Sequence, residues 1–294
     1  MAKVYSIVQP TGKISVLAGE FLNDINRRGY SKHTVRAYRC ALNYLAGALH
    51  DPDVSEVNGQ DIVQALNRDD WTKETTAARQ AAVKSFFGWL KDQNYISVDP
   101  AAGLGNIRRA EGVPRPIPEE DLLKILRTAG RLSLGLRCLF NVLNDTGMRV
   151  GEALSLDVED VDWTPGQESI TIQHGKGDRG RMIPVLPDMP CFNLLRRLCR
   201  ERKAGPLFIT GWKTRANYDW AYYWWGMVVE NAGLAEKGYT IHQLRHSAIT
   251  GWVRNGINLL VARRMAGHKA LRTTERYCAL DNKKIREELR LCGK

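Results

Sequence analysis

Apolar positions in the first hundred residues recur every three or four residues, in four separate runs that each predict an amphipathic helix. The first run ends at Gly29, a residue type common at helix C-termini. Ser31, Asn58 and Thr72 precede the other three runs, where their side chains can cap helix N-termini. Four helices with short connections predict a small helical domain over residues 1–105.

A different pattern begins after residue 118. Alternating apolar and polar positions at residues 170–173 and 183–185 flank a glycine-rich connection, which predicts a β-hairpin with Lys176 at or near its tip. The other periodic runs are helical, and Thr240 is a candidate N-cap for one of them. These helical runs lie at residues 119–126, 134–145, 149–154, 191–202, 217–231, after residue 240, at 259–265, around 277 and at 285–292. The predicted fold class is mainly α with a small β-sheet or hairpin.

Prolines and glycines are dense between these two parts, which predicts an interdomain linker at residues 106–118 and a second domain at residues 119–294. The formal net charge is +11, and most of the basic excess lies in residues 113–294. Such a balance favours a polyanionic partner, nucleic acid before a membrane surface, although ordinary solvated charge is an alternative.

Several arginines are candidate contacts for a phosphate backbone. Arg108, Arg109 and Arg115 lie in or beside the linker, which could cross the backbone as a strap or be a solvated hinge. Arg36 and Arg39 lie off the apolar face of the second helix and are further candidates. An aromatic run at residues 222–225 could stack on bases, but core packing or a subunit contact is the stronger interpretation.

No apolar run approaches the ~20 residues of a membrane span, and the N-terminus lacks the pattern of a signal peptide. The six cysteines are scattered without a CxxC pair, which suits reduced thiols. We therefore expect an unexported, cytoplasmic protein.

The stretch HQLRH carries the first candidate chemistry. His242 and Arg245 are three residues apart, so on a helix they share a face and can bind an anion. His242 and His246 are also spaced like zinc ligands, but the glutamate of an HExxH motif and a completing cluster are missing. His268 and Tyr277 follow within a few turns.

Together with RVGEALSL at Arg149 and the hairpin lysine Lys176, the motifs HQLRH, AGHK and TERY resemble the tyrosine recombinase (phage integrase) family. The resemblance covers nearly the whole chain. It implies an N-terminal four-helix, SAM-like core-binding domain and an integrase-type mixed α+β catalytic domain that ends in a C-terminal helix. It also implies a site-specific DNA recombinase.

The resemblance assigns a role to each motif residue. Tyr277 would attack the scissile phosphodiester and form a 3′-phosphotyrosyl bond, with His242 as the assisting base and Lys176 protonating the departing 5′-oxygen. Arg149 and Arg245 would bind the non-bridging oxygens with forked, permanently charged donors.

His268 would bond the scissile phosphate, and Glu152 would hold the guanidinium of Arg149 or support the site. Because the arginines supply positive charge, neither a cofactor nor a metal ion is expected.

The implied partners are double-stranded DNA with an inverted-repeat core site and three further copies of the chain, as a tetramer that exchanges strands through a Holliday junction. The free protein would be a monomer or weak oligomer associated with the nucleoid and not with a membrane, and accessory DNA-bending proteins are an open option. A type IB topoisomerase and a non-catalytic DNA-binding factor on the same scaffold are the alternatives.

Overall fold

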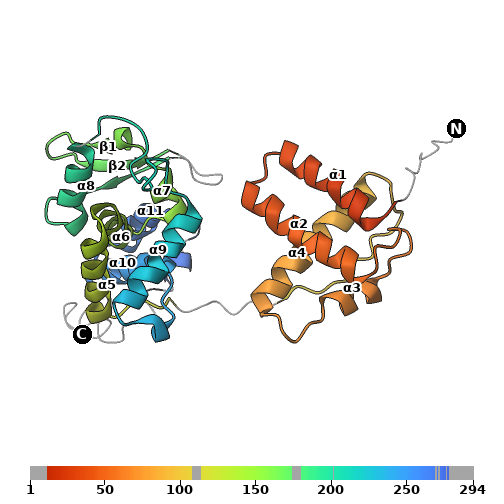
Figure 1. The fold of residues 1–294 in the computed structure, drawn as a ribbon. Helices are drawn as coiled ribbons and strands as arrows, with labels where there is room; N and C mark the ends of the chain where they lie inside the picture. Colours follow the sequence, from red (N-terminus) through yellow and green to blue (C-terminus); the bar gives the residue numbers. More distant parts are fainter. Residues whose placement is uncertain are drawn as a thin grey trace, which may run out of the picture. The chain divides into compact units, whose positions relative to one another are not determined.

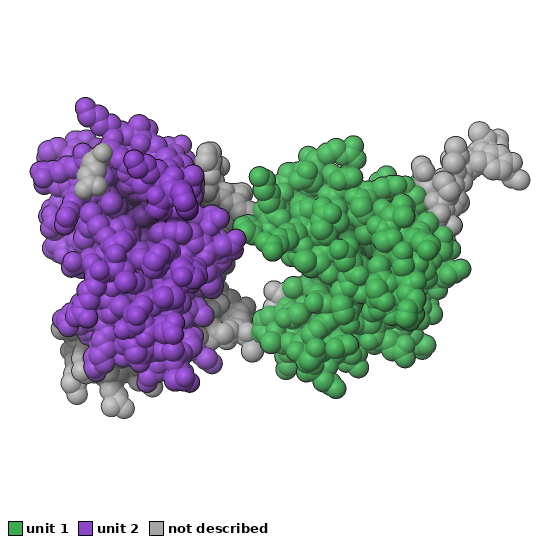
Figure 2. Space-filling model, viewed as in Figure 1, with its two compact units in different colours: residues 1–111 green, residues 112–294 purple. Residues whose placement is uncertain are grey.

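The computed structural model describes residues 12–107, 114–173, 180–200, 202–268, 270, 272–275 and 277. The chain divides into two compact units, residues 1–111 and residues 112–294 (Figure 2). The boundary between them lies within the predicted linker.

The first unit is helical (Figure 1). The side chains of Ser31, Asn58 and Thr72 each accept a hydrogen bond from a backbone N–H in the first turn of the following helix, so the three predicted caps are confirmed. The helices are α1 (Ile14–Arg27), α2 (Lys32–Ala48), α3 (Gly59–Leu66) and α4 (Lys73–Asp92).

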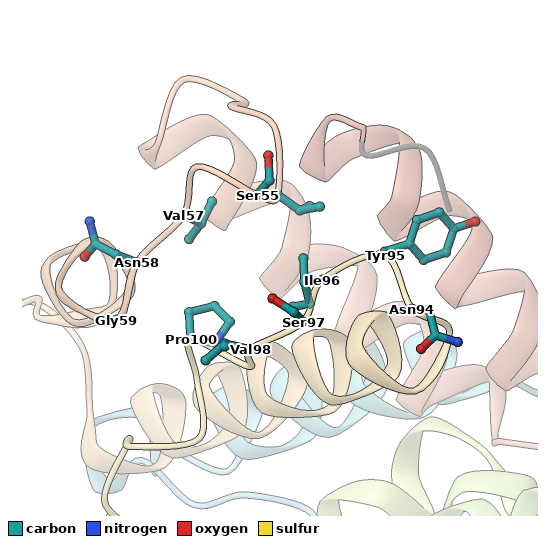
Figure 3. Close-up of a pocket in the computed structure, with 11 residues that line it drawn as sticks. Ser55, Val57, Asn58, Gly59, Asn94, Tyr95, Ile96, Ser97, Val98 and Pro100 are labelled. Atoms are coloured by element: carbon teal, nitrogen blue, oxygen red, sulfur yellow. The ribbon is translucent and has the colours of Figure 1, made fainter. Parts of the chain in front are cut away.

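The core of this unit is rich in aromatic side chains, with Phe21 packed against Phe86 and Trp89 at centroid distances of 5.7 Å for both pairs. A pocket of about 630 Å³ lies between the segment before α3 and the segment after α4, and Figure 3 shows Val57, Ile96 and Pro100 around it. Its lining includes no carboxylate, histidine, lysine or arginine among the described residues.

The second unit combines helices with a small sheet, which confirms the predicted fold class. Figure 1 shows the sheet and α8 at one end of this unit and α5 at the other. The helices are α5 (Glu119–Leu132), α6 (Leu134–Thr146), α7 (Val150–Ser155), α8 (Pro190–Arg200), α9 (Tyr218–Asn231), α10 (His242–Arg254), α11 (Leu259–Ala266) and α12 (Arg272–Glu275), with 3₁₀ turns η1 (Val158–Asp160) and η2 (Ala235–Lys237).

The sheet has three antiparallel strands in the order β1 (Val161–Asp162), β2 (Ser169–Ile172) and β3 (Arg181–Pro184). Strands β2 and β3 form the predicted hairpin, with Ile170 opposite Ile183 and Ile172 opposite Arg181. Lys176 lies outside the described residues. Strand β1 was not predicted, because two residues are too short to show an alternating pattern.

Helix α10 packs against α6 in the second unit. Two local features of this unit differ from the sequence prediction or refine it. Thr240 is not the N-cap of α10: the helix begins at His242 after Ile241, and no side chain caps it. Instead, Gln243 reaches back and its side-chain oxygen accepts a hydrogen bond from the Thr240 backbone N–H at 2.7 Å. In the aromatic run, Trp225 is buried in the core, whereas Tyr222 and Tyr223 are exposed.

None of the helices in the part of the chain that the structure describes is long and apolar enough to span a membrane.

Candidate active site

A buried carboxylate organises the start of α7. The side chain of Glu152, 6% exposed, accepts a hydrogen bond from the Arg149 backbone N–H at 2.7 Å and one from the Arg149 guanidinium at 2.8 Å. Arg149 is the residue directly before α7, so the same carboxylate both satisfies an unpaired N–H at the helix start and holds the guanidinium. The Arg149 side chain remains 47% exposed and can therefore reach a ligand.

Arg181, at the start of β3, binds the same carboxylate from the other side. Its two terminal nitrogens lie 3.0 and 2.7 Å from the two carboxylate oxygens of Glu152, and its Nε donates to the carbonyl of Met265 at 3.0 Å. Gly267 makes room for this side chain, since a Cβ on Gly267 would lie 2.8 Å from the Arg181 guanidinium carbon. Burial alone would raise the pKa of Glu152, but hydrogen bonds from Arg181 and Arg149 overcome it and lower that pKa.

Arg245 is the second buried cation of the site and is 4% exposed. Its terminal nitrogens donate to the carbonyl of Gly147 at 2.6 Å and to the carbonyl of Ala266 at 2.8 Å. Burial and the nearby charge of Arg149 lower the pKa of Arg245 to about 10, so the guanidinium is still charged at neutral pH. The carbonyls fix the guanidinium without neutralising it, and the remaining N–H donors of its five are suited to an anion.

His242 begins α10 and is exposed at the rim of the site. Desolvation by the surrounding protein, followed by the positive charges of Arg245 and Arg149, lowers the pKa of His242 from its usual 6.5. The imidazole is therefore neutral at pH 7. Its ring packs edge-on against His246, one turn further along α10, with the ring centroids 5.0 Å apart.

Tyr277 lies just after α12 and is 4% exposed. Its hydroxyl is 2.7 Å from the Nδ1 of His246. Its ring also stacks with the ring of His268 at a centroid distance of 6.4 Å, and His268 Nδ1 is 2.9 Å from the hydroxyl of Thr274. The tyrosine thus packs against histidines from α10 and from the end of α11.

A small basic cavity adjoins these groups. Its volume is about 370 Å³, and it is lined by Arg181, Arg263, Arg264 and His268 together with Gly180, Leu260 and Gly267. Three guanidiniums and an imidazole around one hollow make an environment that favours a negatively charged ligand.

The structure thus brings together five of the predicted motif residues in one region of the second unit: Arg149, His242, Arg245, His268 and Tyr277. Arg149 and Arg245 are linked to the α11 end through the carbonyls of Gly267 and Ala266. Lys176, Arg108 and Arg109 lie outside the described residues. Arg36 and Arg39 are exposed on α2, and Arg115 is exposed before α5.

Sequence reasoning missed the contacts of two residues. Arg181 had no motif of its own, and the alternating pattern of β3 gave no sign that its side chain is buried on Glu152. His246 was considered only as a zinc ligand, whereas the structure places it on the Tyr277 hydroxyl. The sequence did carry one sign that His246 belongs to the site: it lies one helical turn after His242, so both side chains share a helix face.

In the described ranges, no three His, Cys, Asp or Glu residues are grouped as metal ligands would be.

Comparison with known proteins agrees with this arrangement. Residues 115–284 match the phage integrase family, and residues 19–94 match the phage integrase N-terminal SAM-like domain. The chain is 29% identical over 277 residues to tyrosine recombinase XerC of Rhodospirillum centenum, covering 87% of this chain and 80% of the relative. It is 28% identical over 287 residues to tyrosine recombinase XerD of Listeria monocytogenes, covering 90% and 93%.

Solved structures share the fold at lower sequence identity. A lambda integrase dimer bound to a COC′ core site matches with a TM-score of 0.75 at 16% identity, covering 91% of this chain and 77% of the other. XerH recombinase bound to difH substrate in a pre-cleavage complex matches with a TM-score of 0.73 at 18% identity, covering 96% of each chain.

The chain belongs to the phage integrase family, with the SAM-like helical domain in its first unit and the family's catalytic domain in its second. It is an enzyme of the tyrosine recombinase type, a site-specific DNA recombinase.

Proposed function

We propose that the enzyme cuts and rejoins duplex DNA through a covalent 3′-phosphotyrosyl bond to Tyr277. The observation that carries this proposal is the set of groups around the tyrosine: His246 and His268 contact its ring, and Arg245 interacts with it electrostatically. Arg149 and His242 lie close enough to Arg245 for their charges to interact with it. A tyrosine hydroxyl with a reference pKa near 10 needs such a cationic, base-containing site to attack a phosphodiester at neutral pH.

Arg149 and Arg245 bind the non-bridging oxygens of the scissile phosphate and stabilise the charge that develops there. Their anchoring supports this role: Glu152 fixes one guanidinium, and two backbone carbonyls fix the other. Donors held in place before substrate binds need no reorganisation during the reaction.

His242 assists the attack of Tyr277 as a neutral imidazole, His268 bonds the scissile phosphate, and Lys176 protonates the departing 5′-oxygen. The lowered pKa of His242 suits its part, because a base must be unprotonated at the working pH. Neither a cofactor nor a metal ion takes part in this proposal.

The proposed substrate is double-stranded DNA with inverted repeats around a short core, which the two units of the chain hold through Arg36, Arg39, Arg108, Arg109 and Arg115. The basic cavity beside His268 supports a backbone contact near the reacting phosphate. A related solved structure is a lambda integrase tetramer bound to a Holliday junction, and we extend that assembly to this chain. The enzyme would then act as a homo-tetramer on nucleoid DNA, with room for accessory DNA-bending proteins.

A selection for covalent capture tests the proposal and does not require the DNA site to be chosen in advance. A library of nicked duplexes with a randomised core is incubated with the full chain, and denaturing gels recover any DNA that is covalently attached. We expect a recurring inverted-repeat sequence, and we expect Tyr277→Phe to bind the recovered duplex and to form no adduct. An adduct of undiminished yield with Tyr277→Phe would remove this residue from the role.

Two alternatives give different results with the same duplex. A type IB topoisomerase would relax a supercoiled plasmid without joining two partner duplexes. A non-catalytic DNA-binding factor would retain the duplex and trap no adduct even with the unchanged chain. A recombinase yields joined products from two duplexes that carry the recovered core.

A further inference from the structure

The hydroxyl of Tyr277 has a hydrogen-bond partner to which the family resemblance assigns no role. His246 Nδ1 lies 2.7 Å from the Tyr277 Oη, with the two rings 5.8 Å apart and inclined by 36°. His246 directly follows Arg245 on α10, on the same helix face as His242. Its position is therefore set by the helix that also carries the phosphate-binding arginine.

The histidines around Tyr277 differ in whether they lie within hydrogen-bond distance of its hydroxyl. A general base must lie within hydrogen-bond reach of the proton that it removes, and pKa is the second criterion. Of the histidines that the structure describes, His246 is the one that meets that distance to the Tyr277 hydroxyl. His242 contacts His246 edge-on, and His268 is bonded through its Nδ1 to Thr274 while its ring stacks on the tyrosine.

The tautomer of His246 sets the direction of this hydrogen bond. A neutral imidazole with its proton on Nε2 presents a lone pair at Nδ1, and the phenol O–H donates to it. In that tautomer the bond aligns the proton of Tyr277 with an acceptor. The bond also fixes the position of the Tyr277 hydroxyl oxygen, and the Tyr277 side chain is buried.

We propose that His246 is the residue that accepts the proton of Tyr277 during strand cleavage, an inference that rests on Tyr277 being the nucleophile. As the bond from Tyr277 Oη to phosphorus forms and the bond from phosphorus to the 5′-oxygen breaks, the proton of the hydroxyl moves to His246 Nδ1. The 5′-oxygen takes its proton from the separate acid assigned above. On rejoining, the 5′-hydroxyl attacks phosphorus and gives its proton back to that acid, while His246 returns its proton to the departing tyrosine oxygen.

In this scheme the base is His246, and His242, which the family resemblance implies as the assisting base, acts instead on the orientation and charge of His246. Its ring packs against His246 and constrains the orientation of that imidazole, and its lowered pKa keeps it neutral beside the proton-accepting histidine. Two adjacent imidazolium ions would repel one another, so a neutral His242 favours proton transfer to His246.

The test compares variants of the full chain by their single-turnover rate of adduct formation on the duplex recovered by the selection described above. In His246→Asn the amide oxygen can still accept a hydrogen bond near the Nδ1 position, but it cannot take a proton. We expect His246→Asn and His246→Ala to slow adduct formation by about 10²-fold or more, the usual contribution of general acid–base catalysis, with unchanged DNA binding. His33→Asn, at an exposed position of α2, is the matched control and should be unaffected.

A modified duplex separates this role from protonation of the leaving group. When sulfur replaces the bridging 5′-oxygen, the departing thiolate needs no proton. A variant that lacks the leaving-group acid, such as Lys176→Ala, should recover its rate on this duplex, and His246→Asn should not.

The outcomes distinguish the two proposals. A rate for His246→Asn within about threefold of the unchanged chain would show that a hydrogen bond suffices, and it would overturn the assignment of His246 as proton acceptor. Recovery of His246→Asn on the sulfur duplex would move the histidine to the leaving-group side and overturn it as well. If the unchanged chain forms no adduct, or Tyr277→Phe still does, the proposed function fails instead.

Discussion

Arg181 and Glu152 form a bidentate ion pair in the interior of the second unit, with N–O distances of 2.7 and 3.0 Å. The two side chains are 9% and 6% exposed, so water screens their interaction little. The pair joins the first residue of β3 to the first turn of α7, and Arg149 shares the same carboxylate. The hairpin and Arg149 are therefore connected through one glutamate.

Removing the guanidinium at Arg181 should destabilise the second unit strongly. In Arg181→Met the carboxylate of Glu152 keeps only its contacts to Arg149, and breaking a buried pair typically costs about 3–5 kcal/mol. Arg181→Lys should recover only part of this loss, because an ammonium cannot match the fork geometry or also donate to the Met265 carbonyl. Urea unfolding measures the free-energy change, and equal stability of Arg181→Met and the unchanged chain would contradict the prediction.

The Glu152 carboxylate should also make stability depend on pH in acid. Its folded-state pKa lies below its usual 4.5, so its contribution is present above that value and is lost as the pH falls through the lower folded pKa. Glu152→Gln should be less stable at pH 7 and should show a shallower loss of unfolding free energy below pH 4.5. Asp145→Asn is the control, since burial raises the pKa of Asp145 and gives a pH dependence of opposite sign.

Gly147, directly after α6, is constrained in two ways: by its backbone conformation and by the side chain packed against it. Its φ is +60°, and an added Cβ would lie 2.7 Å from the Trp252 ring. We expect Gly147→Ala to lose more than about 1 kcal/mol of stability and to slow adduct formation, because the Gly147 carbonyl anchors Arg245. Gly151→Ala is the matched control: an added Cβ there meets nothing within 4 Å, so the helix should be unharmed or slightly more stable.

Local signals in the sequence were enough to predict most elements of the fold. Ser31, Asn58 and Thr72 cap their helices because a cap depends on residues only two or three positions apart. Thr240 does not cap α10: its hydroxyl donates to the Gln243 side chain and accepts no backbone N–H of the first turn, and the helix starts two residues later. The two-residue strand β1 carries too few positions for a periodic pattern.

The contacts within the site are long-range, and spacing along the chain does not encode them. Arg181 meets Glu152 across 29 positions, and His246 meets Tyr277 across 31. Family motifs could place the arginines, histidines and tyrosine in one site, because the family resemblance implies a role in one reaction for each of them. The motif indicated Glu152 as the partner of Arg149, but it carried no information on Arg181 or on the carbonyls that anchor Arg245, since those contacts depend on how β3, α7, α10 and α11 pack.

Adduct formation should persist in the presence of a strong chelator. The positive charge that stabilises the phosphate comes from Arg149 and Arg245 in the proposed mechanism, and a guanidinium is not removed by chelation. The expected result is an unchanged single-turnover rate on the selected duplex after dialysis against the chelator. Loss of activity that zinc restores would instead favour His242 and His246 as metal ligands.

Arg245→Lys should behave almost like Arg245→Ala in adduct formation. The guanidinium uses separate nitrogens to donate to Gly147 and to Ala266, and it needs further N–H groups in the same plane for the phosphate. A lysine ammonium keeps the charge but cannot bridge both carbonyls and also bind an oxygen in a fixed orientation. Loss of a preorganised donor typically lowers the rate by about 10²–10³-fold, so both variants should fall by at least that factor while still retaining DNA. If Arg245→Lys reacts at the rate of the unchanged chain, charge alone is sufficient and the fixed fork geometry is not what stabilises the transition state.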